Sequence, residues 1–118
     1  MSDLNTLKDR YETLVKKLTE QFSDGEELEV DQILFIVGIQ ELGQLHRKFS
    51  KDEKINVIHI AICRLLEPYG YYSFSHFDDD GWPHYDVIDQ LPFLKAGEQS
   101  RLMKEALVQY FLEKDYLD

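Results

Sequence analysis

The amino-acid sequence predicts a mainly α-helical fold, a four-helix bundle-like domain with a small β-hairpin inserted between the third and fourth helices. Apolar residues recur at steps of three and four over long segments, which is the spacing of one face of a helix. An aromatic segment over residues 71–91 contains a tight-turn sequence. No Gly/Ser-rich linker interrupts the 118 residues, so we expect a single helical domain over residues 1–118.

The first helix is predicted from about Asp3 to Phe22. Its apolar residues fall on one stripe: Leu4, Leu7, Tyr11, Leu14 and Leu18. The stripe resembles the seam of a coiled coil over about two and a half heptads. That length is short for a coiled coil, so a bundle helix is the preferred interpretation.

The second helix is predicted from Leu28 or Gln32 to Lys48. Acidic residues precede it, and carboxylates interact favourably with the positive end of a helix dipole. Asp24 or Asp31 is the expected N-cap. The basic side chains of His46, Arg47 and Lys48 are expected to complement the opposite end.

The run from Ile33 to Val37 is also compatible with a buried strand, because every side chain in it is apolar. The apolar pattern continues to Phe49 and favours a helix. Gly38 and Gly43 would then lie inside the helix, where each costs about 1 kcal/mol relative to alanine. The close approach of a neighbouring backbone is the expected compensation.

The third helix is predicted to begin after Ser50, because Ser50 and Glu53 have the spacing of a capping box. Pro68 and Gly70 are expected to end it. Its inner stripe is predicted from residues at steps of three and four: Ile55, Ile58, Ile62, Leu65 and Tyr69.

The hairpin is predicted from the sequence Asp78-Asp79-Asp80-Gly81, which suits a tight turn that ends with a left-handed glycine. The strands would be Tyr71 to Phe77 and Trp82 to Ile88, and Pro83 confines the second to an edge. The last helix is expected from Glu98 to Glu113, with an inner face made of Leu102, Ala106, Leu107, Tyr110 and Phe111.

Charge and composition narrow the classes of partner. The formal net charge is −10, from 23 acidic and 13 basic side chains, and this field repels phosphate backbones and anionic headgroups. We therefore expect neither nucleic acid nor membrane as a partner. Cys63 is the only cysteine, so an internal disulfide is impossible and a reducing compartment fits best. The longest apolar run is far too short to span a bilayer, and we expect a cytoplasmic protein.

Two groups of residues have the types found in metal sites. Asp78, Asp80, Asp86 and Asp89 resemble part of a calcium-binding loop, but Pro83 stands where that loop needs glycine. The second group lies at helical spacing on the third helix: His59, Cys63 and Glu67. No matching pair of ligands occurs elsewhere. We expect no metal and no other cofactor, and whether either group binds a metal stays open.

Histidines and carboxylates of the hairpin form the only candidate for acid/base chemistry. His76, His84, Asp86 and Asp89 could converge across the hairpin. The sequence offers no nucleophile, oxyanion device or phosphate-binding glycine loop beside them. An enzyme acting on a small molecule or through a metal, with a His/Asp pocket between hairpin and bundle, is the alternative hypothesis for the function.

The preferred hypothesis is a non-enzymatic interaction module. Tyrosine and tryptophan are enriched at protein interfaces, and aspartates beside them favour a cationic or polar partner. The protein would self-associate as a homodimer, or bind another protein, through helix one, the aromatic hairpin, or both. The candidate binding residues are Tyr72, Phe74, His76, Trp82, His84, Tyr85 and Asp86.

Overall fold

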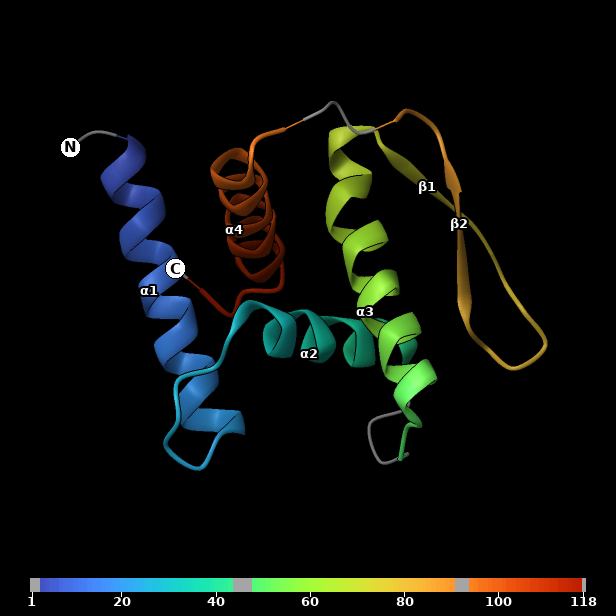
Figure 1. Ribbon diagram of the computed structural model, residues 1–118, viewed down its shortest axis with the longest axis horizontal. Coiled ribbons are helices and arrows are strands. Elements are labelled where there is room, and N and C mark those ends of the chain that lie inside the picture. The colour runs from blue at the N-terminus through green and yellow to red at the C-terminus, as the bar shows by residue number, and fades with distance from the viewer. Residues whose placement is uncertain (1–2, 44–47, 91–93, 118) are drawn as a thin grey trace. The chain divides into compact units, whose positions relative to one another are not determined.

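The computed structural model describes residues 3–43, 48–90 and 94–117. In these ranges the chain forms four helices, α1 (Asp3–Phe22), α2 (Val30–Leu42), α3 (Lys51–Leu66) and α4 (Ala96–Glu113) (Figure 1). A 3-10 helix, η1 (Glu67–Tyr69), follows α3. Two antiparallel strands, β1 (Tyr72–Phe77) and β2 (Pro83–Val87), lie between α3 and α4. The prediction of a mainly α fold with a hairpin between the third and fourth helices is confirmed.

The chain divides into two compact units. One consists of Met1–Leu28 together with Pro92–Asp118 and contains α1 and α4; the other consists of Glu29–Leu91 and contains α2, α3 and the hairpin. Among the described residues, no helix is both long enough and apolar enough to cross a membrane.

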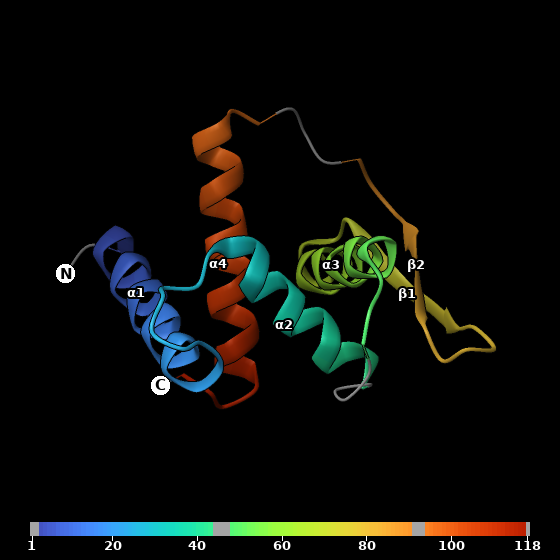
Figure 2. The ribbon, with the colours of Figure 1, turned by 60° about the horizontal axis from the view of Figure 1, so that its bottom comes forward.

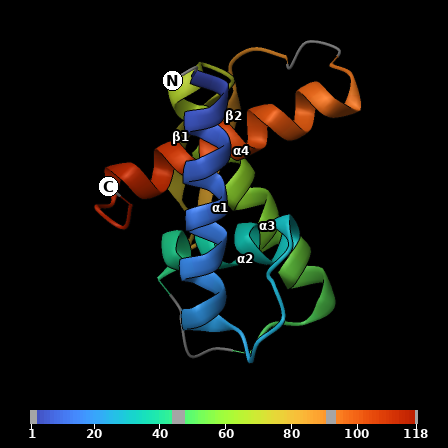
Figure 3. The same cartoon turned by 90° about the vertical axis from the view of Figure 1, so that its left-hand side faces the viewer.

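The first unit is a pair of helices, and Figure 3 shows α1 crossing α4. Leu14 and Leu18 of the predicted α1 stripe are fully buried, whereas the Leu4 side chain lies outside the described residues. The buried residues of α4 are Ala106, Leu107, Val108, Tyr110 and Phe111. Four of them belong to the predicted inner face, whereas Val108 was not predicted and Leu102, which was, is only half-buried. The Tyr116 hydroxyl donates to Oε1 of Gln21 at 2.6 Å, which fastens the segment after α4 to α1.

In the second unit, α2 packs against α3, and the hairpin lies beside α3 (Figures 1 and 2). The run that was compatible with a strand is helical. At Gly38 a Cβ atom would lie 2.2 Å from the carbonyl oxygen of Val57 on α3. The close backbone approach expected to compensate for this glycine is therefore present.

Both ends of α2 differ from the prediction. The helix ends at Leu42, and Gly43 caps it in the left-handed region at a φ of 76°, so Gly43 is not an interior residue. A glycine at that position meets no Cβ penalty, which makes it an effective stop signal. The N-cap is Glu29, whose N–H donates to the side chain of Gln32 at 2.8 Å. His46 and Arg47 lie outside the described residues.

The α3 helix begins as predicted but turns a different face inward. The N–H of Glu53 donates to the Ser50 hydroxyl at 3.2 Å, and the Ser50 N–H donates to the Glu53 carboxylate at 3.0 Å. Ile55 of the predicted stripe is 60% exposed. The buried residues are Val57, Ile60, Ala61, Cys63, Leu65 and Leu66, and only Leu65 of these belongs to the predicted stripe. Ile58, Ile62 and Tyr69 of that stripe are half-buried. The prediction was thus wrong in part, because α3 is apolar on more than one side and the contact at Gly38 selects the side that contains Val57.

The hairpin forms where predicted, with Gly81 at a φ of 85° in the turn. Phe74 pairs with Tyr85, and His76 pairs with His84, so Ser75 is an extra residue in β1. Such a β-bulge lets two residues on one strand oppose one residue on the other. The sequence gives no sign of this bulge.

Candidate functional site

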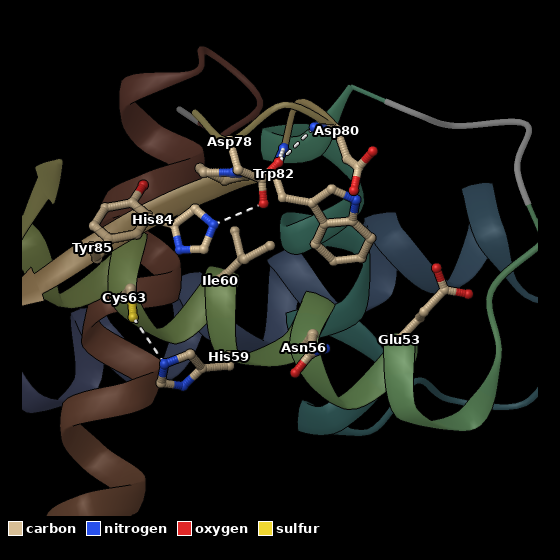
Figure 4. A pocket seen from close by; sticks show the side chains of 11 residues that line it. Glu53, Asn56, His59, Ile60, Cys63, Asp78, Asp80, Trp82, His84 and Tyr85 are labelled. Atoms are coloured by element: carbon tan, nitrogen blue, oxygen red, sulfur yellow. Dashed lines mark hydrogen bonds and ion pairs between the residues drawn. The ribbon is translucent and has the colours of Figure 1, made fainter. Parts of the chain in front are cut away.

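A pocket of about 780 Å³ lies between α3 and the hairpin. This volume is within the range of small-ligand sites, roughly 300–1,000 Å³. The helix contributes Glu53, Asn56, His59, Ile60 and Cys63, and the hairpin contributes Asp78, Asp80, Trp82, Pro83, His84 and Tyr85 (Figure 4). Among the described residues that line it, carboxylates are present and neither lysine nor arginine occurs.

Asp78 organises the hairpin end of the pocket. Its Oδ1 accepts hydrogen bonds from the backbone N–H groups of Asp80 at 2.9 Å and of Trp82 at 3.0 Å. Aspartate side chains commonly stabilise tight turns by such bonds to the backbone. Its Oδ2 accepts a hydrogen bond from Nε2 of His84 at 2.8 Å (Figure 4). The hydrogen bond from His84, and then the one from the Trp82 backbone, lower the pKa of Asp78. Asp78 is therefore a carboxylate at neutral pH that fixes the orientation of the His84 ring.

Aromatic contacts with other parts of the same unit hold the Trp82 ring in place. Its ring meets Phe49 edge to face with centroids 6.3 Å apart, and Phe49 meets Phe35 of α2 in the same way at 5.9 Å. Edge-to-face pairs of this kind are a favoured aromatic geometry. The turn of the hairpin is thus anchored to the helices through Trp82, while part of the ring lines the pocket.

The α3 side of the pocket contains a close pair, His59 and Cys63, with Nε2 and Sγ 3.5 Å apart. Cys63 is only 2% exposed, and burial raises the pKa of its thiol to about 11. Cys63 is therefore a neutral thiol at physiological pH and a poor nucleophile. Glu67, the third residue of the predicted metal group, instead accepts the Phe74 N–H at 2.8 Å, so the three do not converge.

No group of three His, Cys, Asp or Glu side chains in the described part of the chain is arranged to hold a metal ion. The aspartates of the turn are used differently from calcium ligands, since Asp78 accepts hydrogen bonds from its own loop.

A second, smaller cleft of about 240 Å³ lies over other residues of the hairpin and helices. Phe74, Phe77 and Tyr85 supply its aromatic wall. Across from them Nε of Arg64 lies 3.3 Å from Oε1 of Glu41. Burial, and next the charge of Glu41, raise the pKa of Tyr85 to about 12, so this phenol keeps its proton.

The bulge sets which hairpin side chains lie together. Phe74 and Phe77 have ring centroids 5.0 Å apart, and Phe74 and Tyr85 have centroids 5.8 Å apart, so these three share one face. The rings of His76 and His84 stack on the other face, with centroids 5.0 Å apart and planes inclined by 7°. Phe74 and Phe77 are three positions apart in β1, and in a regular strand they would face opposite sides. They face the same side because Ser75 is an extra residue between them.

The predicted binding residues are distributed over both faces. Trp82, His84 and Tyr85 line the larger pocket, Phe74 lines the smaller cleft, and Tyr72 meets the ring of His59 at 6.4 Å.

The predicted convergence of hairpin histidines and aspartates needs correction in two respects. The carboxylate partner of His84 is Asp78 and not Asp86, because the turn places Asp78 beside the ring. Asp86 pairs with Ser73 across the hairpin and is exposed, and it lines neither pocket.

The sequence interpretation missed Glu53 and Asn56 on α3 as pocket residues, and it did not connect His59 and Cys63 with the hairpin. A signal was present for two of these four residues, because His59 and Cys63 share a helical stripe. Nothing local in the sequence indicates that this stripe faces His84.

Comparisons with protein-family models, with curated proteins and with solved structures gave no significant match to this chain.

Proposed function

We propose that this protein is an interaction module that binds a positively charged segment of another protein on the surface formed by α3 and the hairpin. The observation that carries the proposal is the pocket that is lined both by the carboxylates of Glu53, Asp78 and Asp80 and by the ring of Trp82. A lysine or arginine side chain fits such a site through charge pairing and through attraction to the face of an aromatic ring.

The charge of the surrounding chain supports this choice. Between Arg64 and Lys95 the sequence contains six acidic residues and no lysine or arginine: Glu67, Asp78, Asp79, Asp80, Asp86 and Asp89. The hairpin is therefore a local concentration of negative charge within a chain that is already acidic. Such a surface attracts cationic partners and repels anionic ones.

Exposed apolar side chains are also concentrated on the hairpin. In the described part of the chain, four large apolar residues between positions 74 and 88 are exposed: Phe74 (41%), Phe77 (61%), Val87 (65%) and Ile88 (61%). Clustered exposed apolar residues with polar neighbours are typical of protein-binding surfaces. The apolar stripe of α1 is a weaker candidate, since Leu14 and Leu18 are already buried.

The experiment uses Trp82, the only tryptophan, as a probe inside the proposed site. Titration with a short lysine-rich peptide should change the tryptophan emission in a saturable way, and a glutamate-rich peptide of the same length should not. The affinity should fall as salt is added, because exposed charges are screened.

Two variants, each of which removes one negative charge, distinguish binding in the pocket from attraction by the net charge of the whole protein. Asp80→Asn alters a residue that lines the pocket, and Asp79→Asn alters its neighbour, which does not. We expect Asp80→Asn to weaken peptide binding by roughly threefold to tenfold and Asp79→Asn by less than about twofold. Equal binding of the basic and acidic peptides, or equal effects of the two variants, would contradict the proposal.

The hydrogen bond between Asp78 and His84 supports a second candidate, an enzyme that acts on a small molecule. A carboxylate that orients an imidazole in a pocket is a common arrangement for a general base. The version of this hypothesis in which the enzyme depends on a metal can be tested directly. Elemental analysis of untagged protein should find stoichiometric zinc, iron or manganese that is lost in a His84→Gln variant, and protein without metal would remove that form.

A further inference from the structure

We propose that the partner binds as an extended basic strand, which adds to the hairpin at the outer edge of β2. This inference rests on the proposed function and deepens it, because it specifies the backbone conformation and the residue pattern of the partner. Addition of a peptide strand to an open sheet edge is an established mode of recognition, in which main-chain hydrogen bonds supply affinity.

The register shows which backbone groups of β2 point away from β1. Ile88 N–H donates to the Tyr71 carbonyl at 3.0 Å, so residues 71 and 88 form a hydrogen-bonded pair. Such pairs alternate with non-hydrogen-bonded pairs along an antiparallel ladder. The pairs of Tyr72 with Val87 and of Phe74 with Tyr85 are therefore of the second kind. The N–H and C=O groups of Tyr85 and Val87 point outward.

The corresponding outer edge of β1 is occupied at Phe74. The N–H of Phe74, which by the same alternation points outward, donates to Oε2 of Glu67 at 2.8 Å. A strand approaching this edge would have to displace a carboxylate that belongs to the protein. Side chains that occupy edge donors are one way in which proteins prevent unwanted strand pairing.

Over Tyr85 and Val87, no residue that the structure describes protects the edge of β2 in this way. Considering only the residues that the structure describes, nothing hydrogen-bonds to the outward backbone groups of these two residues. Val87 is 65% exposed, and Asp86 between them is exposed as well. Toward the turn the edge ends at Pro83, which lacks an N–H. The open edge is thus short and has a defined limit.

Charge selects a basic strand as the occupant over a second copy of this chain. A strand added beside β2 would place alternate side chains next to Tyr85 and Val87 on one face, and next to His84 and Asp86 on the other. A partner that alternates apolar residues with lysine or arginine matches both faces. A second copy that paired residue 85 of one chain with residue 87 of the other would place the Asp86 side chains of the two chains opposite each other, and like charges directly opposite on neighbouring strands are destabilising.

The first test uses a short peptide that alternates lysine with valine, with backbone N-methyl groups on alternate residues. In an added strand only every second N–H points toward β2. N-methylation of one alternate set should weaken binding about tenfold or more, whereas N-methylation of the other set should change the affinity by less than about twofold. Tryptophan emission reports the affinity in each case.

The second test changes the protein at Val87. Val87→Pro removes an outward N–H and leaves the ladder between β1 and β2 intact, because Val87 donates no hydrogen bond to β1 in this register. Val87→Ala is the matched control for the loss of the side chain. We expect peptide binding to weaken about tenfold in Val87→Pro and less than about threefold in Val87→Ala.

The outcomes distinguish this inference from the proposed function. If the unmethylated basic peptide does not bind, both fail. If it binds and both methylated sets bind equally well, the basic-segment module stands and strand addition is refuted. A dimer in light scattering that Val87→Pro dissolves would replace the basic strand with a second copy as the occupant. Unequal binding of the two methylated sets, with a monomeric protein, supports the inference.

Discussion

Replacing Gly38 by alanine tests the packing of α2 on α3. The new Cβ atom would lie 2.2 Å from the Val57 carbonyl oxygen and 2.6 Å from its Cγ1 atom, whereas ordinary contact begins at 3.4 Å. The oxygen belongs to a helix backbone and cannot rotate away. Relief therefore requires the two helices to separate locally by about 1 Å, which loosens the buried interface around Ile33 and Val37.

The magnitude follows from two opposing effects. Overpacking in a dense core costs about 1–3 kcal/mol, and the upper end applies here because the obstructing atom is backbone. Alanine has a higher helix propensity than glycine, which offsets about 1 kcal/mol. We expect Gly38→Ala to lower the free energy of unfolding by about 2 kcal/mol, a large fraction of the roughly 5–15 kcal/mol that stabilises a typical domain.

Urea titration followed by far-UV circular dichroism measures this difference. Gly97→Ala in α4 is the matched control, because nothing lies within 4 Å of its Cβ position, and it should keep or raise stability. Adding Val57→Ala to Gly38→Ala should not restore stability, since the carbonyl oxygen remains. A Gly38→Ala protein as stable as the wild type would refute the close approach of α2 and α3.

Three further predictions concern the cap, the turn and the thiol. Ser50→Ala removes the hydroxyl that caps α3 and should lower the free energy of unfolding by about 1 kcal/mol in the same titration. The hydrogen bond from His84 leads the interactions that lower the pKa of Asp78, so the turn should be fully stable above the pKa of an unfolded aspartate, about 3.9, and lose stability as pH falls through the lower folded pKa. Trp82 emission in the wild type and in Asp78→Asn from about pH 7 to about pH 2 checks this, and identical profiles would contradict it. Cys63, with a pKa raised to about 11, should be alkylated by iodoacetamide at neutral pH far more slowly in the native protein than in urea, and equal rates would disprove its burial.

The parts of the fold that the sequence predicted depend on local chemistry. Ser50 and Glu53 satisfy each other's amides within one turn, so the start of α3 is encoded by four residues. Gly81 and the preceding aspartates define the hairpin turn in the same local way. The end of α2 was also encoded locally, by Gly43, but the apolar pattern beyond it masked the stop signal.

The parts that the sequence did not predict depend on contacts between distant residues. The α3 helix has isoleucines on several sides, so periodicity alone cannot choose the buried face, and the missing Cβ of Gly38 makes the choice. In the candidate site, too, the features that depend on distant contacts could not be predicted. The aromatic hairpin was visible in the composition, whereas the placement of His59 and Cys63 opposite His84 depends on how the hairpin returns along α3.

The extra residue in β1 has a consequence for length variation. Removing Ser75 would convert the bulge into regular pairing while Phe74, His76 and Phe77 kept the sides they now occupy. Removing any other single residue between Tyr72 and Phe77 while the bulge persists would send the side chains beyond it to the opposite side. A deletion scan along this strand should therefore show one permissive position in an otherwise intolerant segment.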